Sequence, residues 1–316
     1  MQPFAYHRAD DSSRPDGPGT ELLAGGTDLL PAMKVGLVTP VSVIDLKHSD
    51  LNDTIERTAT GWRLDALATL ADVEDHAGLR ASIPAIGEAA ASAATRQLRT
   101  RATIAGNLLQ RSRCSYYRNP DLTCWLEGGT TCFAREGRHE HHATVDTGPC
   151  ISTQPSDLPG VLVALDALVE VRVGDQTTTR PIGEHFSSPT DERRSLNTLA
   201  AGEIVTAVIV PAADRASVYL KAMDRAAWQF ALVGVAAVIA DGGVRLTAGG
   251  VAPVPWRLDA VEQHLAGVAP DELTDEIIDL AAALAGTGMD PLPDNRYKVT
   301  LLAGLVRQAL RRLRSM

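Results

Sequence analysis

Four cysteines are the residues of this chain best suited to metal or redox chemistry. Cys114, Cys124, Cys132 and Cys150 are the only cysteines among the 316 residues. Their spacing, C-x9-C-x7-C-x17-C, lacks the paired C-x2-C knuckles of a zinc ribbon. Four thiolates are the number that a [4Fe–4S] cluster requires, one for each iron. A zinc site, two disulfides and ordinary buried thiols remain alternative interpretations.

Three histidines of the same segment could add metal ligands. His139, His141 and His142 belong to the run R-E-G-R-H-E-H-H. Because most of this run is polar or charged, we interpret it as a solvated loop rather than as part of a metal site.

Charge and composition exclude several classes of protein. The net charge of −9 argues against a nucleic-acid-binding surface, which is normally basic. No apolar run approaches the roughly 18–20 residues of a membrane span. The first residues, MQPFAYHRADDSSRPDG, show no basic region followed by an apolar stretch, so we expect a cytoplasmic location. Export together with a signal-bearing partner subunit is the alternative.

The periodicity of apolar residues predicts two parts. The first part begins with a strand, a glycine turn, a short helix and a second strand over 22–46, followed by a strand over 62–67. A helix begins at Thr69, with Asp72 in a capping box. Further helices are predicted over 83–99 and 158–168, and further strands over 169–173 and 205–210. The second contains a hairpin, 233–240 and 244–251, joined at Asp241-Gly242-Gly243, and helices over 271–285 and 295–313. We place the boundary near residue 213.

A glycine turn follows the first predicted strand of the 22–46 segment. It lies in the run Leu22, Leu23, Ala24, Gly25, Gly26, Thr27, Asp28, Leu29, Leu30. Two adjacent glycines let backbone N–H groups converge, and the start of a helix adds the positive end of its dipole. The arrangement suits a pyrophosphate, although an ordinary turn has the same pattern. It matches neither G-x-G-x-x-G nor a P-loop.

Two further polar segments could contact the same ligand. Thr103, Gly106 and Asn107 belong to a segment in which small residues and an amide allow close approach. The second segment is a polar turn before the helix predicted over 158–168, with the residues Thr153, Gln154, Pro155, Ser156 and Asp157. Helix capping by Ser156 or Asp157 explains this turn equally well.

Together these segments resemble the FAD-binding subunits of the molybdenum hydroxylases, the family of xanthine dehydrogenase, carbon monoxide dehydrogenase and aldehyde oxidoreductases. The matching motifs are A-G-G-T-D-L-L at 24–30, A-T-I-x-G-N ending at Asn107, P-S-D at 155–157, Y-x-K-x-x-x-R at 219–225 and G-G-V-A-x-x-P-W-R at 249–257. Residues 108–152, which hold every cysteine, resemble the insertion of a subgroup with an extra [4Fe–4S] cluster, the periplasmic aldehyde oxidoreductases.

The resemblance implies an α+β fold. A FAD-binding domain of the PCMH type, like that of vanillyl-alcohol oxidase, would cover residues 1–213, with a cluster-binding insertion at about 108–152. A smaller domain of antiparallel sheet and helix bundle would cover residues 214–316. The implied cofactors are FAD and one [4Fe–4S] cluster, with the four cysteines as its ligands.

The resemblance also assigns FAD-binding residues. They are residues 22–30, Thr103, Gly106, Asn107, residues 153–157, Ile204 and Lys221. Lys221 would face the flavin ring, where its charge favours the anionic reduced flavin. A solvated surface lysine is the alternative. We expect no catalytic residue in this chain.

The implied role is that of an electron-transfer subunit in a heterotrimeric oxidoreductase. A molybdopterin-binding large subunit would oxidise the substrate, and a small subunit with [2Fe–2S] clusters would pass the electrons to FAD and an external acceptor. The resemblance implies no nucleic-acid partner and no membrane span. A zinc-stabilised scaffold module without a redox role is the alternative from another class.

Overall fold

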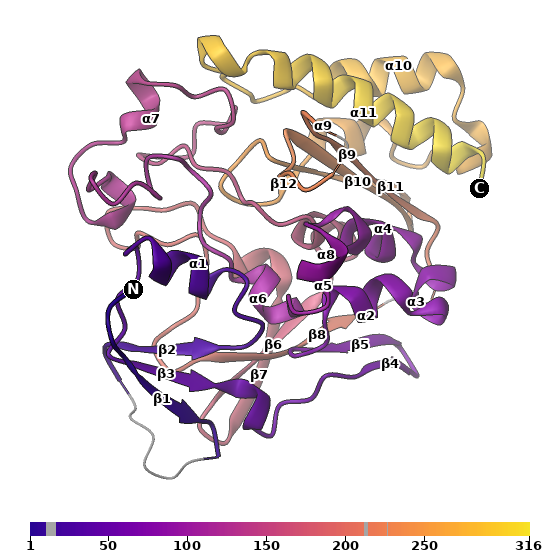
Figure 1. The fold of residues 1–316 in the computed structure, drawn as a ribbon. Coiled ribbons are helices and arrows are strands. Elements are labelled where there is room, and N and C mark those ends of the chain that lie inside the picture. The colour runs from indigo at the N-terminus through magenta and orange to yellow at the C-terminus, as the bar shows by residue number, and fades with distance from the viewer. Residues whose placement is uncertain (11–16, 212–213, 226) are drawn as a thin grey trace.

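The computed structural model describes residues 1–10, 17–211, 214–225 and 227–316. The predicted domain boundary near residue 213 falls outside these described residues. Three sheets organise the described chain (Figure 1). Within the described ranges, no helix combines the length and the apolar character needed to cross a bilayer.

The first sheet is small, parallel and N-terminal. Its order is β1-β3-β2, with the strands β1 (Ala5–Arg8), β2 (Thr20–Leu23) and β3 (Ser42–Asp45). Helix α1 (Leu29–Lys34) follows β2, and a 3₁₀ turn, η1 (Leu46–His48), follows β3. Leu29 and Met33 of α1 pack against Val43, which positions the glycine turn between β2 and α1.

The second sheet is antiparallel and has the order β4-β5-β8-β6-β7. Its strands are β4 (Ile55–Thr58), β5 (Gly61–Asp65), β6 (Leu168–Val173), β7 (Gln176–Pro181) and β8 (Ile204–Val210), and η3 (Ile182–His185) follows β7. The helices of this part are α2 (Leu70–Asp75), α3 (Ala77–Ser82), α4 (Pro84–Ser92), α5 (Arg96–Arg99), α6 (Ile104–Leu108) and α8 (Leu158–Ala164).

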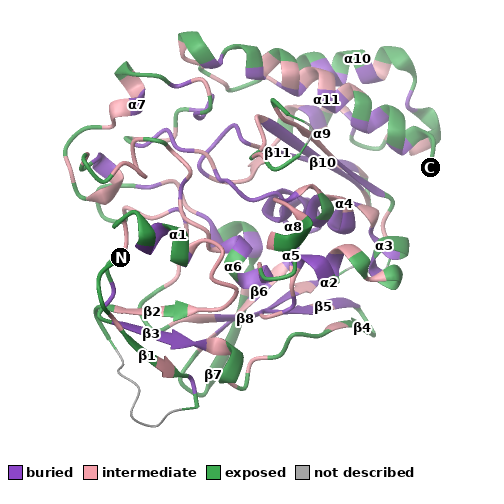
Figure 2. Cartoon of the chain, in the orientation of Figure 1, coloured by how far each residue is buried: buried purple, intermediate pink, exposed green. Residues whose placement is uncertain are grey.

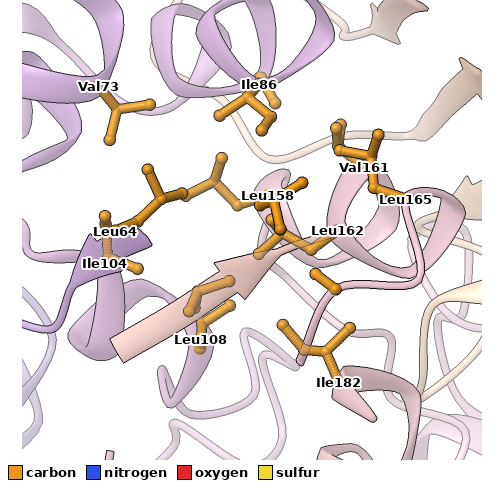
Figure 3. Close-up of a cluster of buried hydrophobic side chains, with 14 of the residues drawn as sticks. Leu64, Val73, Ile86, Ile104, Leu108, Leu158, Val161, Leu162, Leu165 and Ile182 are labelled. Carbon is orange, nitrogen blue, oxygen red and sulfur yellow. The ribbon is translucent and has the colours of Figure 1, made fainter. Parts of the chain in front are cut away.

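A buried apolar core fixes α6 and α8. Figure 3 shows Ile104 and Leu108 of α6 directed into this core, which Leu64 of β5 and Leu158 and Leu162 of α8 share. All five side chains are almost completely buried. Helix α6 is therefore held by the face opposite to Gly106.

The third sheet belongs to the C-terminal part and has the order β12-β11-β10-β9. Its elements are β9 (Ser217–Ala222), β10 (Val233–Ala240), β11 (Gly243–Gly249), β12 (Trp256–Arg257), α9 (Asp259–His264), η4 (Pro270–Glu272), α10 (Asp275–Leu284), η5 (Pro293–Asn295) and α11 (Tyr297–Arg314). Helix α11 packs on β9 and β10, with α10 against it, while α4 and α8 contact the same sheet (Figure 1).

The cysteine segment is mostly irregular. It contains a 3₁₀ turn, η2 (Trp125–Glu127), and one short helix, α7 (Phe133–Glu136). In Figure 1 it forms the lobe around α7, beside α1 and below the start of the yellow helix α11. Figure 2 shows that much of its return path toward α8 is buried or half-buried.

Several predicted elements differ in length from those observed. The capping box of Thr69 and Asp72 is confirmed, and so is the hairpin, in which Ala240 pairs with Gly243. The helix predicted over 83–99 is interrupted, because α4 ends at Ser92 and Ala94 has a φ of 47°. The helix predicted over 158–168 ends at Ala164, and Leu168 already begins β6.

Candidate functional site

Gly25 lets two distant segments of the chain touch. A Cβ at this position would lie 1.8 Å from the carbonyl oxygen of Arg101, far inside contact distance. Gly26 has a φ of +74°, in the left-handed region that favours glycine. The glycine turn therefore packs directly against the residues that lead into α6.

The segment ending at Asn107 is bound to the segment before α8. Thr103 caps α6 by accepting a hydrogen bond from the Gly106 N–H at 3.1 Å. The Ser156 hydroxyl donates to the Asn107 carbonyl and accepts from Gln110. Asn107 Oδ1 is buried and has no partner. Such an orphaned acceptor fits a site that a ligand donor completes.

A cavity of about 500 Å³ lies between the glycine turn, α6 and residues 194–205. This volume is in the range of cofactor pockets. Of the predicted FAD-binding residues, it is lined by Leu22, Ala24, Gly25, Gly26, Thr27, Asp28, Leu29, Thr103, Gly106 and Ile204. Thr153, Gln154 and Pro155 instead line a second cavity of about 190 Å³, together with Phe230. The predicted residues are thus divided between two cavities, and neither cavity is lined by Leu23, Leu30, Asn107, Ser156, Asp157 or Lys221.

Lys221 is buried in an ion pair. Its Nζ lies 2.8 Å from Asp157 Oδ2 and also donates to the Ser92 carbonyl at 3.0 Å. Its side chain is 3% exposed, so the alternative of a solvated surface lysine is wrong. Tyr219 donates to the same carboxylate at 2.6 Å, and burial, followed by that negative charge, raises the Tyr219 pKa well above its usual value. Neither Lys221 nor Asp157 lines the 500 Å³ cavity.

Three arginines of the cysteine segment converge on Asp28 of the glycine turn. Arg118 donates to Asp28 at 2.7 Å, Arg113 lies 2.8 Å from it, and the Arg111 N–H donates at 3.0 Å. Burial alone would raise the pKa of Asp28, but Arg113, the Arg111 N–H and Arg118 together lower it. Arg111 also pairs with Glu21 at 2.9 Å. We did not predict these arginine contacts from the sequence, although the grouping of three arginines within eight residues is visible there.

All four cysteines line one small pocket. Tyr116, Tyr117, Trp125 and His142 line it too. The thiols are free; Cys124 and Cys150 are buried, and Cys114 and Cys132 are half-buried. Among the described residues, no three His, Cys, Asp or Glu side chains are arranged as ligands of a single metal ion.

Each thiol receives backbone N–H groups from the turn that follows it, and Cys132 receives one more from Ile151, the residue after Cys150. The donors are Tyr116 and Tyr117 for Cys114, Leu126 and Glu127 for Cys124, Ala134 and Ile151 for Cys132, and Ser152 for Cys150. Such donors stabilise negative charge on sulfur, as in cysteines that hold iron–sulfur clusters.

The thiol pKa values reflect burial and mutual contact. Burial raises the pKa of Cys114 and raises that of Cys124 to about 11. The Cys150 thiol donates to the Cys132 sulfur, which lowers the Cys132 pKa to about 6 and raises that of Cys150.

Our interpretation of the histidine run as a solvated loop is wrong for two of its members. His139 and His142 are 7% and 6% exposed, whereas His141 is exposed. His142 Nε2 lies 3.1 Å from the Cys114 sulfur. Burial, followed by the charge of Lys298, lowers the His142 pKa to about 4. The local sequence did not indicate that these two histidines are buried, because the residues that cover them, among them Asn295 and Lys298, belong to the C-terminal part.

Two family models together match most of the chain. Residues 7–213 match the FAD-binding domain in molybdopterin dehydrogenase, and residues 218–313 match the CO dehydrogenase flavoprotein C-terminal domain. A curated relative, the aldehyde oxidoreductase FAD-binding subunit PaoB of Escherichia coli (strain K12), is 38% identical over 276 residues, which cover 84% of this chain and 86% of the relative.

More distant relatives share the fold. The carbon monoxide dehydrogenase medium chain of Afipia carboxidovorans is 24% identical over 329 aligned residues, which cover 99% of this chain and 97% of the relative. Crystallised carbon monoxide dehydrogenase of Hydrogenophaga pseudoflava matches with a TM-score of 0.73 and 23% identity, over 98% of each chain. Quinoline 2-oxidoreductase of Pseudomonas putida 86 matches with a TM-score of 0.74 and 18% identity, over 99% of this chain and 98% of the other. The predicted fold class is confirmed.

Proposed function

Because this chain belongs to the family of FAD-binding subunits of molybdopterin dehydrogenases, we propose that it is the FAD- and [4Fe–4S]-binding electron-transfer subunit of a molybdenum-containing aldehyde oxidoreductase. Family membership makes it a FAD-binding oxidoreductase subunit. The cluster, the substrate class, the partner subunits and the electron route are the proposal.

In this proposal the enzyme is a heterotrimer. A molybdopterin-binding large subunit oxidises the substrate, a small subunit relays the electrons through [2Fe–2S] clusters, and the flavin of this chain delivers them to an external acceptor. The names of the relatives as medium chains or FAD-binding subunits support such an assembly. The identity to an aldehyde oxidoreductase subunit supports an aldehyde as the substrate class.

The contact of Gly25 with Arg101 carries the flavin assignment. This contact packs the glycine turn against residues 101–102, which precede α6, and the 500 Å³ cavity lies where the two segments meet. The proposed flavin-binding residues remain 22–30, Thr103, Gly106, Asn107, 153–157, Ile204 and Lys221. Asn107 offers its unpaired acceptor, and the 153–157 segment is fixed to α6 through Ser156.

The cysteine segment fits a cluster. Cys114, Cys124, Cys132 and Cys150 would each ligate one iron, since all four line one pocket and each receives N–H donors. A bound cluster would supply one-electron redox capacity. We assign residues 1–213, with the insertion at about 108–152, to the flavin domain and residues 214–316 to the second domain.

Cofactor analysis of the purified complex tests this function. We expect flavin released by acid, iron near four per chain in anaerobic preparations, and two further subunits in a pull-down of this chain. Colourless protein without flavin would refute the flavin assignment. Zinc without iron or flavin would support the scaffold alternative, and a catalytically complete monomer would refute the heterotrimer.

A further inference from the structure

His142 connects a proposed cluster ligand with the C-terminal domain. Its Nε2 lies 3.1 Å from the Cys114 sulfur. Its backbone carbonyl accepts hydrogen bonds from Lys298 Nζ at 2.9 Å and from Asn295 Nδ2 at 3.3 Å. Asn295 and Lys298 lie at the start of the α11 region and are fully buried. One residue thus receives donors from the second domain and directs its ring to a thiol of the first.

Residues of η5 and of the first turn of α11 hold the neighbouring residues of the cysteine segment. The Asp294 N–H donates to His139 Nε2 at 3.2 Å, and the Tyr297 hydroxyl donates to the Glu140 carbonyl at 2.9 Å. Asn295 Nδ2 also donates to the Ala143 carbonyl at 2.9 Å. The backbone over 139–143 is therefore fixed by a separate domain rather than by its own secondary structure.

The backbone of His142 is held in place, whereas its second ring nitrogen has no partner. Its Nδ1 is buried and has no partner, so no hydrogen bond on that nitrogen sets the ring angle. Metal-site histidines are usually oriented through that second nitrogen. Here the two donors on the carbonyl fix the backbone from which the ring extends toward Cys114. Whenever Nε2 carries a proton, it can donate to a thiolate at Cys114.

A hydrogen bond to a ligating sulfur favours the more negative, reduced state of a cluster. We propose that His142 donates from Nε2 to the Cys114 sulfur, that Asn295 and Lys298 hold it in place, and that the C-terminal domain thereby raises the reduction potential of the cluster. This inference rests on the proposed [4Fe–4S] cluster. His142 is a positioning residue and not an iron ligand.

The test is an EPR-monitored redox titration of the purified holo-complex, with iron content measured in parallel. His142→Phe removes the N–H donor at similar volume, and we expect full iron with a shift of the midpoint to a more negative potential. His142→Gln retains an N–H donor and should remain near the wild-type potential. Lys298→Met should shift the midpoint in the same direction as His142→Phe. His141→Phe, at the exposed neighbour, is the matched control and should show no shift.

Two results would overturn the inference while leaving the proposed function intact. One is full iron in His142→Phe with an unchanged midpoint. The other is equal loss of iron in His142→Phe and His142→Gln, which would make the histidine a ligand or a structural residue. Wild-type complex without iron would instead refute the proposed cluster and this inference with it.

Discussion

Arg118 Nη2 donates to Asp28 Oδ1 at 2.7 Å across 90 residues of sequence. The bond joins the cysteine segment to the glycine turn of the proposed flavin site. The Arg113 guanidinium and the Arg111 backbone N–H reach the same carboxylate, so Asp28 organises two positive groups and one backbone donor at the entrance to the insertion. The segments that form the two proposed cofactor sites are therefore connected through the Asp28 side chain.

Replacing Asp28 should destabilise this junction. In Asp28→Asn the arginines lose their counter-charge, and we expect the free energy of unfolding to fall by about 1–3 kcal/mol at pH 7. Asp10→Asn is the control, because its ion pair with Arg8 is exposed and should contribute less than about 1 kcal/mol. Equal losses in the two variants, measured by denaturant unfolding, would contradict the organising role of Asp28.

The pH dependence of the Asp28 effect has a defined sign. The pKa of Asp28 is lowered in the folded chain from 3.8, so its stabilising contribution is present above pH 3.8. It is lost as the pH falls through the lower folded value. The difference between wild type and Asp28→Asn should therefore shrink in acid.

Gly25→Ala should separate the two segments that form the proposed flavin cavity. The new Cβ would lie 1.8 Å from the Arg101 carbonyl oxygen, so the backbone must move. We expect purified protein with at least tenfold weaker flavin binding, about 1.4 kcal/mol, measured by fluorescence titration of the apoprotein. Gly304→Ala in α11 is the control, because nothing lies near its Cβ. Wild-type flavin affinity in Gly25→Ala would argue against this geometry.

The sequence predicted the local parts of the site well. The glycine turn, the capping box of Thr69 and Asp72, and the hairpin turn before Gly243 depend on a few adjacent residues, so their patterns are visible without the fold. The broken helix at Ala94 was missed because its positive φ has no propensity signal in an alanine-rich run. A tertiary constraint there overrides local preference.

Long-range contacts could not be predicted in the same way. Asp28 and Arg118 lie in segments without a shared periodicity, and the burial of His142 depends on Asn295 and Lys298 of another domain. A polar run such as 138–142 is normally solvated. Here distant donors satisfy carbonyls of the run, which allows two of its members, His139 and His142, to be buried.

Lys221→Met should leave a buried carboxylate without its counter-charge. Lys221 and Asp157 are 3% and 6% exposed, and removing one partner of such a pair costs about 3–5 kcal/mol. The double variant Lys221→Met with Asp157→Asn should recover most of the free energy of unfolding, because the uncompensated charge disappears. Asp50→Asn, in an exposed pair with Arg172, should change stability by less than about 1 kcal/mol. Additive losses in the double variant would contradict direct coupling.

Lys298 should make stability depend on alkaline pH. Burial lowers its pKa from 10.5 to about 7, so between these values the unfolded chain binds a proton that the folded chain has released. Stability should therefore rise with pH from 7 toward 10.5, by at most about 1.4 kcal/mol per unit. Lys298→Met should remove this rise, whereas Lys34→Met at an exposed site should retain it. Parallel pH profiles of wild type and Lys298→Met would count against a buried lysine with a lowered pKa.

Cys124 gives a direct test of cluster ligation. Its sulfur is buried in the pocket that the other three cysteines line, and it receives N–H donors from Leu126 and Glu127. A thiolate ligand cannot be replaced by a serine hydroxyl without weakening the bond to iron, since soft sulfur donors select such clusters. We expect Cys124→Ser to lose most of the iron in anaerobically purified complex. Thr123→Ser, at the exposed neighbour, should retain it.

The other three cysteines extend this test to the whole ligand set. Cys114→Ser, Cys132→Ser and Cys150→Ser should also lose iron, because a [4Fe–4S] cluster takes one protein ligand at each iron. The flavin should be retained more fully than the iron, since the 500 Å³ cavity is lined by none of the four cysteines. Retained iron in all four single Cys→Ser variants, or disulfides found by mass spectrometry in the native protein, would reject the cluster. Zinc at one equivalent, lost in the same variants, would identify the segment as a structural metal site instead.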